Sequence, residues 1–156
     1  MPLTISFDLV ATGYLRCTVR PARRNFVFLS SYDSDFLQDL VLAALSTLRE
    51  YRSLCFASRS SQTEWLWIFE RESIDETTIE IAEVILISID SGFGTKSIAK
   101  FACKDIIFAK AVYSAATDIL AKHGIRKFNG MWPDHPFPKE LVNLLGKAIA
   151  SVENDA

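Results

Sequence analysis

The first thirty residues alternate hydrophobic and polar side chains with a period of two. Residues 3–10, LTISFDLV, and residues 14–20, YLRCTVR, both follow this pattern, and Gly13 lies between them. Such alternation is typical of half-buried strands, and the glycine predicts a hairpin turn. Pro21 ends the hairpin, and residues 25–31, NFVFLSS, predict a third strand.

A helical period replaces the alternation after the third strand. Between Ser34 and Tyr51 the hydrophobic residues recur at spacings of three and four, which predicts a helix with one apolar face. Asp33 or Ser34 is placed to cap the free N–H groups at the start of this helix. Asp35 and Asp39 follow near the positive end of the helix dipole.

Three more strands are predicted in the middle of the chain. They are residues 53–59, SLCFASR; residues 63–72, TEWLWIFERE; and residues 77–89, TTIEIAEVILISI. The connections SRSSQ and ESIDE are polar and short enough for antiparallel turns. Glu83 interrupts the isoleucine face of the last strand, and a bulge that turns it outward is a commoner outcome than a partly buried carboxylate. That face comprises Ile79, Ile81, Ile85, Ile87 and Ile89.

The last third of the chain predicts one more strand and two helices. Residues 91–95, SGFGT, match neither glycine-rich phosphate-binding motif and therefore predict a flexible loop. Residues 96–104 predict a seventh strand. Helices are expected over residues 105–122, ended by Gly124, and over residues 138–152, which begin with a proline.

These elements together predict an α+β fold, a meandering antiparallel sheet of about six or seven strands with three helices packed mainly on one face. The length of 156 residues suits a single domain, residues 1–156, and 49% hydrophobic residues are enough for a core. The apolar stretches are too short and too interrupted by charge to span a bilayer, and the N-terminus lacks a basic leader. We therefore expect a soluble, cytoplasmic protein that makes no membrane contact.

The cysteines do not suggest a metal site. Cys17, Cys55 and Cys103 are widely separated, form no CxxC pair and have no histidine at ligand spacing. They are typical of reduced and mostly buried thiols in a cytosolic protein. No metal and no cofactor is expected.

Charge is distributed unevenly along the chain. Residues 64–90 contain eight acidic residues and one basic residue, Arg71, so this segment carries a formal charge of −7. Because the whole chain carries −2, the remainder carries +5. Such a field would attract a basic protein and speed its association. The eight acids are Glu64, Glu70, Glu72, Asp75, Glu76, Glu80, Glu83 and Asp90.

The stretch GMWPDHPFP, residues 130–138, combines a tryptophan, a histidine, a phenylalanine and three prolines within nine positions. His135 could serve a catalytic dyad only with a distant acid such as Asp8 or Glu83, because its chain neighbour Asp134 cannot easily orient it. Three prolines fix the backbone and two aromatic side chains offer apolar surface, so a stapling loop is the better interpretation. His123, beside Gly124, suits the negative end of a helix dipole.

Other clusters also have ordinary structural interpretations. Trp65, Trp67 and Phe69 could stack bases, but their acidic neighbours would repel phosphates, so core packing is favoured. A basic group around the first hairpin could bind RNA, or it could be an ordinary solvent-exposed sheet edge. The acidic residues lack a DxD or EF-hand pattern, and a solvated sheet face is their simplest interpretation. The basic group is Arg16, Arg20, Arg23 and Arg24.

Three segments resemble a family of small bacterial proteins found with polymorphic toxin systems, including contact-dependent growth inhibition. The first is the start of the first helix, the second is the TEWLW stretch, and the third is similar to a W-x-x-H-P-F-P ending before the final helix. The matching residues are Ser31, Tyr32, Ser34, Asp35, Leu37, Asp39 and Leu40, then Glu64 and Trp67, then Trp132, His135, Pro136, Phe137 and Pro138.

The resemblance implies an immunity protein that binds and blocks the C-terminal domain of a cognate toxin. Many such toxins are nucleases, which are basic because they grip phosphates. We therefore expect a non-enzymatic inhibitor without catalytic residues, whose acidic surface blocks the substrate groove of a basic nuclease and which does not itself bind nucleic acid. A binding or scaffold module unrelated to toxins is the alternative, and a small hydrolase using His135 is the third. The expected toxin-binding residues are Glu64, Glu70, Glu72, Asp75, Glu76 and Glu80.

Overall fold

Two antiparallel sheets and four helices make up the computed structural model, which describes residues 2–155 except 50, 52, 61 and 62. The first sheet has the order β1 (Leu3–Ala11), β2 (Tyr14–Pro21), β3 (Phe26–Ser31). The second has the order β4 (Ser53–Arg59), β5 (Glu64–Arg71), β6 (Glu76–Ser88), β7 (Gly92–Lys104). The helices are α1 (Phe36–Thr47), α2 (Asp105–His123), α3 (Ile125–Met131) and α4 (Lys139–Asn154).

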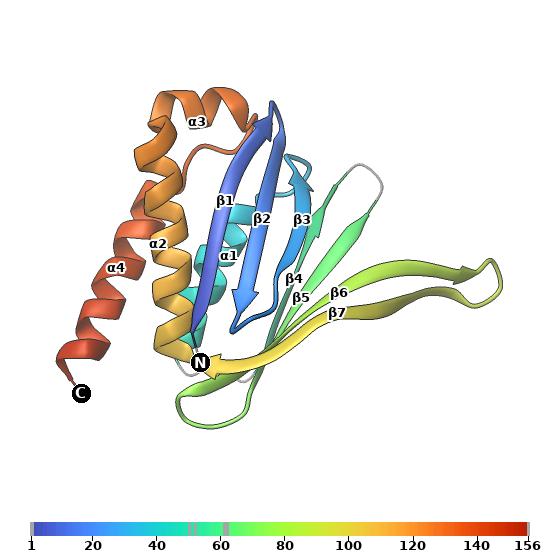
Figure 1. The fold of residues 1–156 in the computed structure, drawn as a ribbon, viewed down its shortest axis with the longest axis horizontal. Helices are drawn as coiled ribbons and strands as arrows, with labels where there is room; N and C mark the ends of the chain where they lie inside the picture. Colours follow the sequence, from blue (N-terminus) through green and yellow to red (C-terminus); the bar gives the residue numbers. More distant parts are fainter. Residues whose placement is uncertain (1, 50, 52, 61–62, 156) are drawn as a thin grey trace.

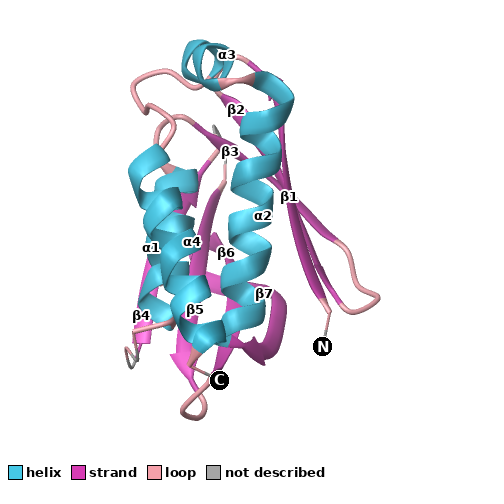
Figure 2. Ribbon diagram, turned by 90° about the vertical axis from the view of Figure 1, so that its left-hand side faces the viewer, coloured by secondary structure: helices cyan, strands magenta, loops and turns pink. Residues whose placement is uncertain are grey.

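The helices gather on one side of the strands, as predicted. Figure 2 shows α1, α2 and α4 side by side in front of the strands, and α4 packs on α1 and α2 rather than on a sheet. The prediction of one continuous sheet is wrong. After β3 the chain leaves the first sheet and forms α1. Strand β4 then begins a second sheet; it lies beside β3 but is not paired with it in one sheet.

Several predicted boundaries shift in the structure. Asp35, rather than Asp33 or Ser34, caps α1, because its carboxylate accepts a hydrogen bond from the backbone N–H of Gln38. The helix ends at Thr47, four residues before the predicted end. Gly124, with a φ of 76°, ends α2 as expected, but the chain then forms the short α3, which the sequence pattern did not predict. Pro138 precedes α4 as its N-cap.

Aromatic side chains form the centre of the core between the sheets and α1. Trp67 and Phe69 of β5 are fully buried, as are Ile79 and Ile81 of β6. The Trp67 ring stacks on Phe56 with centroids 5.8 Å apart, and it also contacts the rings of Phe28 and Phe36. The prediction that the aromatic residues of β5 pack in the core is therefore confirmed for Trp67 and Phe69, while Trp65 is half-buried.

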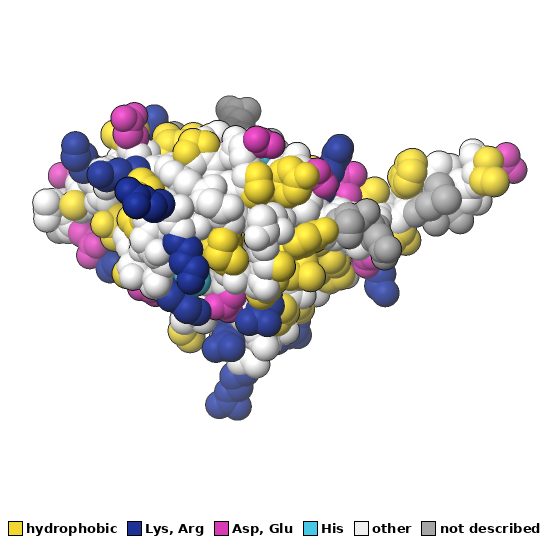
Figure 3. Space-filling model, turned by 90° about the horizontal axis from the view of Figure 1, so that it is seen from above, with side chains coloured by type: hydrophobic (Ala, Val, Ile, Leu, Met, Phe, Trp, Pro, Cys, Tyr) yellow, Lys and Arg dark blue, Asp and Glu magenta, His cyan; other side chains and the backbone are white. Residues whose placement is uncertain are grey.

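The β6–β7 hairpin continues well beyond the rest of its sheet. Both strands have 13 residues, whereas β5 has 8 and begins only at Glu64, opposite Val84. We call residues 85–95 the arm; it projects from the body in Figures 1 and 3. The predicted loop SGFGT is wrong, because Gly92 already begins β7 and only the preceding residues turn.

The arm divides the predicted isoleucine face. Ile79 and Ile81 lie in the core, but a register irregularity follows Ile81, and Ile85 and Ile89 are exposed. A bulge is present, but it lies in the β6–β7 pairing, while the pairing of β6 with β5 stays regular, so Glu83 remains on the same face as its partner Trp65. The prediction that a bulge turns Glu83 outward is therefore wrong, and its carboxylate is half-buried, opposite Lys96 of β7. The side chain of Ile87 and the turn residues 61–62 fall outside the part of the chain that the structure describes.

Arg71 connects four segments of the chain at the lower end of the core. Its guanidinium donates to the carbonyl oxygens of Thr47 and Tyr51, each at 2.7 Å, and to those of Ser73 and Ile74. It also forms a 2.8 Å ion pair with Asp105, at the start of α2. The second oxygen of Asp105 accepts a 2.6 Å hydrogen bond from the Thr77 hydroxyl. The one base of the acidic segment therefore has a structural role.

We expect Arg71→Met to lower the free energy of unfolding by about 3 to 5 kcal/mol, because it leaves the buried carboxylate of Asp105 without its partner. Urea denaturation followed by tryptophan fluorescence measures the change. Arg16→Met is the matched control, since Arg16 pairs with Asp8 on the surface and its loss should cost less than about 1 kcal/mol. Equal effects of the two substitutions would contradict the structural role of Arg71.

Candidate protein-binding surface

The face of the second sheet that points away from the helices carries most of the predicted binding residues. Side chains alternate along a strand, so Glu64 and Glu70 point away from the face on which Trp67 and Phe69 enter the core. Glu80 joins them on this outer face, because Ile68 of β5 lies directly opposite it.

The turn between β5 and β6 and the first residue of β6 add three more carboxylates beside this face. Glu72 accepts a 2.6 Å hydrogen bond from the Thr78 hydroxyl, and Asp75 forms a 2.9 Å ion pair with Lys104. Lys104 also lies opposite Glu76 in the register. Its ammonium donates to the exposed Asp75 carboxylate and thereby lowers the pKa of that group below its ordinary value. We call Glu70, Glu72, Asp75, Glu76 and Glu80 the acidic face.

Glu64 is separated from the acidic face. It begins β5, six residues before Glu70, which corresponds to roughly 20 Å along a strand. Its carboxylate lies 3.4 Å from the guanidinium of Arg59 on β4. The structure therefore brings five of the six predicted residues together and leaves the sixth at the opposite end of the sheet.

Lysines on β7 reduce the charge that the sequence segment suggested. Lys100 lies opposite Glu80, and Lys104 lies opposite Glu76. Five carboxylates against two lysines leave the acidic face with a formal charge of −3. These two lysines lie outside residues 64–90, and only strand pairing brings them next to the acidic residues. The charge of the segment therefore could not reveal them.

Hydrophobic side chains lie beside these charges on the outer face. Leu66 and Ile68 of β5 are only half-buried there, between Glu64 at one end and Glu70 at the other. Ile68 also lines a small depression with Glu70, Glu80 and Lys100. An apolar centre with a charged surround is the usual composition of a protein-binding surface.

Three of the residues that carry the family resemblance, Ser31, Ser34 and Glu64, meet around Arg59 at the other end of the sheet. The Ser31 hydroxyl donates to the carbonyl of Arg59, and the backbone N–H of Arg59 donates to the Ser34 hydroxyl. Arg59 in turn pairs with Glu64. This network joins the β3–α1 connection to the β4–β5 hairpin, so these residues have a structural role.

The WPDHPFP stretch lies against the same connection. His135 contacts the carbonyl oxygen of Tyr32 through Nε2 at 2.8 Å, and its Nδ1 lies 3.7 Å from the Asp35 carboxylate. The side chains of Trp132 and Phe137 are buried. An Nε2–H that donates to a carbonyl cannot accept a proton from a substrate, so the geometry favours the stapling interpretation over the catalytic one.

His123 lies in the last turn of α2, near the negative end of the helix dipole, as the sequence suggested. Its two ring nitrogens are buried without a hydrogen-bond partner among the described residues. The helix end is closed by the backbone instead, since the N–H of Gly124 donates to the carbonyl of Leu120.

Asp39 has the largest carboxylate pKa shift near this loop. Partial burial, and after it the neighbouring charge of Asp35, raise its pKa to about 6, while His135 acts in the opposite direction. Burial also raises the pKa of Asp35. Two adjacent carboxylates under a histidine ring therefore make α1 sensitive to pH.

The remaining candidates from the sequence are dispersed. All four arginines of the basic group are exposed, and Arg16 pairs with Asp8, as on a solvated edge. Cys17 and Cys103 are buried, as expected of most of the thiols, whereas Cys55 is exposed. Within the described residues, no group of three or more histidines, cysteines or carboxylates could hold a metal ion.

Comparison with known proteins gives no family for this chain. No protein-family model, curated protein or solved structure matches it. In the described part of the chain, no helix has both the length and the apolar character needed to cross a membrane.

Asp39→Asn should stabilise the protein at neutral pH. The folded state holds this proton up to about pH 6, whereas an unfolded aspartate loses it near pH 4, so the free energy of unfolding falls as pH rises between these values. Asparagine removes that loss and should add about 1 to 2 kcal/mol at neutral pH, after allowance for solvent screening, and little in acid. Urea denaturation across this pH range measures the difference. Asp118→Asn, on the exposed face of α2, is the matched control, because it removes a carboxylate that is not buried.

His135→Ala should lower the free energy of unfolding by about 1 to 2 kcal/mol, because the contact with the Tyr32 carbonyl is lost. His135→Gln retains an N–H donor and should recover part of the loss. Thermal unfolding by circular dichroism compares the three proteins. If neither substitution changes stability, His135 does not staple the loop.

Proposed function

We propose that this protein is a non-enzymatic inhibitor that binds a basic protein domain through the outer face of its second sheet. The observation that carries the proposal is the position of the acidic face beside the half-buried Leu66 and Ile68, on a side of the sheet that the helices leave uncovered. In the light of the family resemblance, we propose that the partner is the C-terminal domain of a cognate toxin, with nuclease activity, and that the complex forms in the cytoplasm.

In the proposed mechanism, charged residues attract the partner and apolar contacts hold it. The acidic face would attract the basic surface that a nuclease uses for phosphates, and its carboxylates would occupy the positions of those phosphates. Charges at the rim mainly increase the association rate, whereas a few centrally buried contacts supply most of the affinity. Leu66 and Ile68 are placed to supply the central contacts.

A binding module for another basic protein would use the same surface and differs only in its partner. The hydrolase alternative has less support, because both ring nitrogens of His135 face groups of the protein itself, the Tyr32 carbonyl and the Asp35 carboxylate. We therefore propose no catalytic residue.

Charge reversal of the acidic face tests the proposal. The variant Glu70→Lys/Glu72→Lys/Glu76→Lys should slow association with the basic toxin domain encoded beside its gene by about 10- to 100-fold at low salt, because steering is lost. Stopped-flow fluorescence measures the rate, and protection of growth during toxin expression measures the outcome. The difference from wild type should shrink as salt rises.

The matched control is Glu140→Lys/Glu153→Lys/Asp155→Lys, which changes net charge equally at the start and end of α4. It should retain most of the association rate. Equal slowing by both variants would mean that overall charge matters and the acidic face does not. Full protection by the acidic-face variant, or the lack of any basic toxin domain beside the gene, would rule out the proposed function.

A further inference from the structure

The arm exposes large hydrophobic side chains that nothing in the described structure covers. Ile89 is 95% exposed and Phe93 is 74% exposed, and Ile85 is also exposed. Figure 3 shows the arm as a separate projection with hydrophobic side chains and an acidic side chain near its end. Soluble proteins rarely leave such groups of apolar side chains without a function in binding.

The arm also has a free strand edge. Among the described residues, β6 pairs only with β7 beyond Val84, because β5 begins at Glu64, the partner of Val84. Free edges tend to pair with other strands unless charged residues oppose this. Lys96, Lys100 and Lys104 lie on β7 beyond the arm, whereas residues 85–88 of β6 and residues 92–95 of β7 contain no charged residue. Charge therefore protects neither edge of the arm, and the β6 edge is the one that β5 leaves unpaired.

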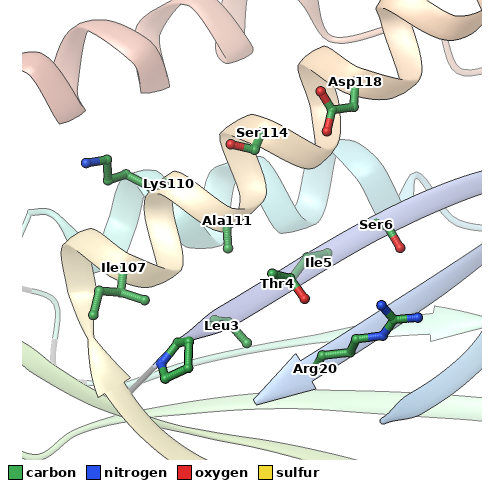
Figure 4. Close-up of a pocket in the computed structure, with 11 residues that line it drawn as sticks. Leu3, Thr4, Ile5, Ser6, Arg20, Ile107, Lys110, Ala111, Ser114 and Asp118 are labelled. Atoms are coloured by element: carbon green, nitrogen blue, oxygen red, sulfur yellow. The ribbon is translucent and has the colours of Figure 1, made fainter. Parts of the chain in front are cut away.

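A second free edge lines a cleft between β1 and α2. Within the described chain, β1 is the outer strand of its sheet and pairs only with β2. Its first half diverges from the first half of α2, and the two border a cleft of about 790 Å³. Figure 4 shows this cleft, with Ala111 directed from α2 towards β1. A cleft between an edge strand and a helix is a common site for the addition of an extended strand.

The arm and the cleft match in length, polarity and charge. Residues 85–89 of the arm and residues 2–6 along the cleft each span roughly 17 Å as extended chain. Ile107 and Ala111 offer the cleft an apolar wall. Two basic residues of the cleft, Arg20 and Lys110, would face the acidic Asp90 at the end of the arm, although Asp118 adds one opposing charge.

We propose that the arm of one copy docks in the β1–α2 cleft of a second copy, and that the exchange is reciprocal. The free edge of β6 would extend the first sheet of the partner at β1, and Ile89 and Phe93 would be covered in the cleft. A reciprocal exchange makes this contact twice, which brings the buried area towards the roughly 1,600 Å² of a standard interface. The acidic face takes no part, so this proposal and the proposed function can fail separately.

Sedimentation velocity of the full chain over a wide concentration range tests the exchange. Wild type should form a dimer. The arm variant Ile89→Ser/Phe93→Ser should weaken its association about 100-fold or more, because the apolar contact is lost. The cleft variant Thr4→Lys/Ser114→Arg should do the same, since both positions are exposed at the cleft and tolerate polar side chains. Unchanged urea midpoints would exclude unfolding as the cause.

Mixing the two variants provides the decisive result. The arm variant retains an intact cleft and the cleft variant retains an intact arm, so a mixed dimer can form one good contact and should appear only in the mixture. The variant Ser91→Cys/Ser114→Cys in a Cys55→Ser background should form an intermolecular disulfide, whereas Ser91→Cys/Ser151→Cys in the same background should not.

Three results would overturn the proposal. A wild-type protein that stays monomeric at all concentrations would exclude self-association. A cleft variant that dimerises normally would mean that the arms pair with each other instead. A mixture that fails to form the mixed dimer would exclude the arm-to-cleft contact.

Discussion

The fold depends on the buried ion pair between Arg71 and Asp105. Removal of two charges from water is costly. It is tolerated here because each of the three guanidinium nitrogens donates to at least one acceptor. Arg71 ends β5, and its acceptors belong to the end of α1, the chain before β4, the β5–β6 turn and the start of α2. A single side chain thereby fixes both sheet-covering helices relative to the second sheet.

This constraint leaves the two faces of the second sheet with different roles. The face towards the helices holds Trp67, Phe69, Ile79 and Ile81, together with the Arg71 network. The opposite side of the sheet holds the residues of the acidic face, the half-buried Leu66 and Ile68, and the lysines of β7. The charged residues can gather there because the core needs only alternate positions of each strand. The proposed binding surface follows from that alternation.

Much of the fold was predictable because hydrophobic spacing reports burial directly. The first hairpin, α2 with its terminal glycine, and the inward aromatic residues of β5 all agree with the sequence pattern. The division into two sheets and the helix α3 were not predictable, since both depend on how the chain turns after α1 and after Gly124. The arm was also missed, because isoleucines on a long strand indicate burial whether or not a neighbouring strand is present.

For the candidate site, the sequence by itself determined the excess of carboxylates between Glu64 and Asp90 and their alternation with hydrophobic residues. Only the tertiary structure decided which of them share a surface. Strand pairing moved Lys100 and Lys104 beside Glu80 and Glu76, paired Glu64 with Arg59 at the far end, and buried Arg71 against Asp105. The physical reason is that electrostatic interaction depends on distance in space, and a sheet places residues twenty or more positions apart directly opposite one another.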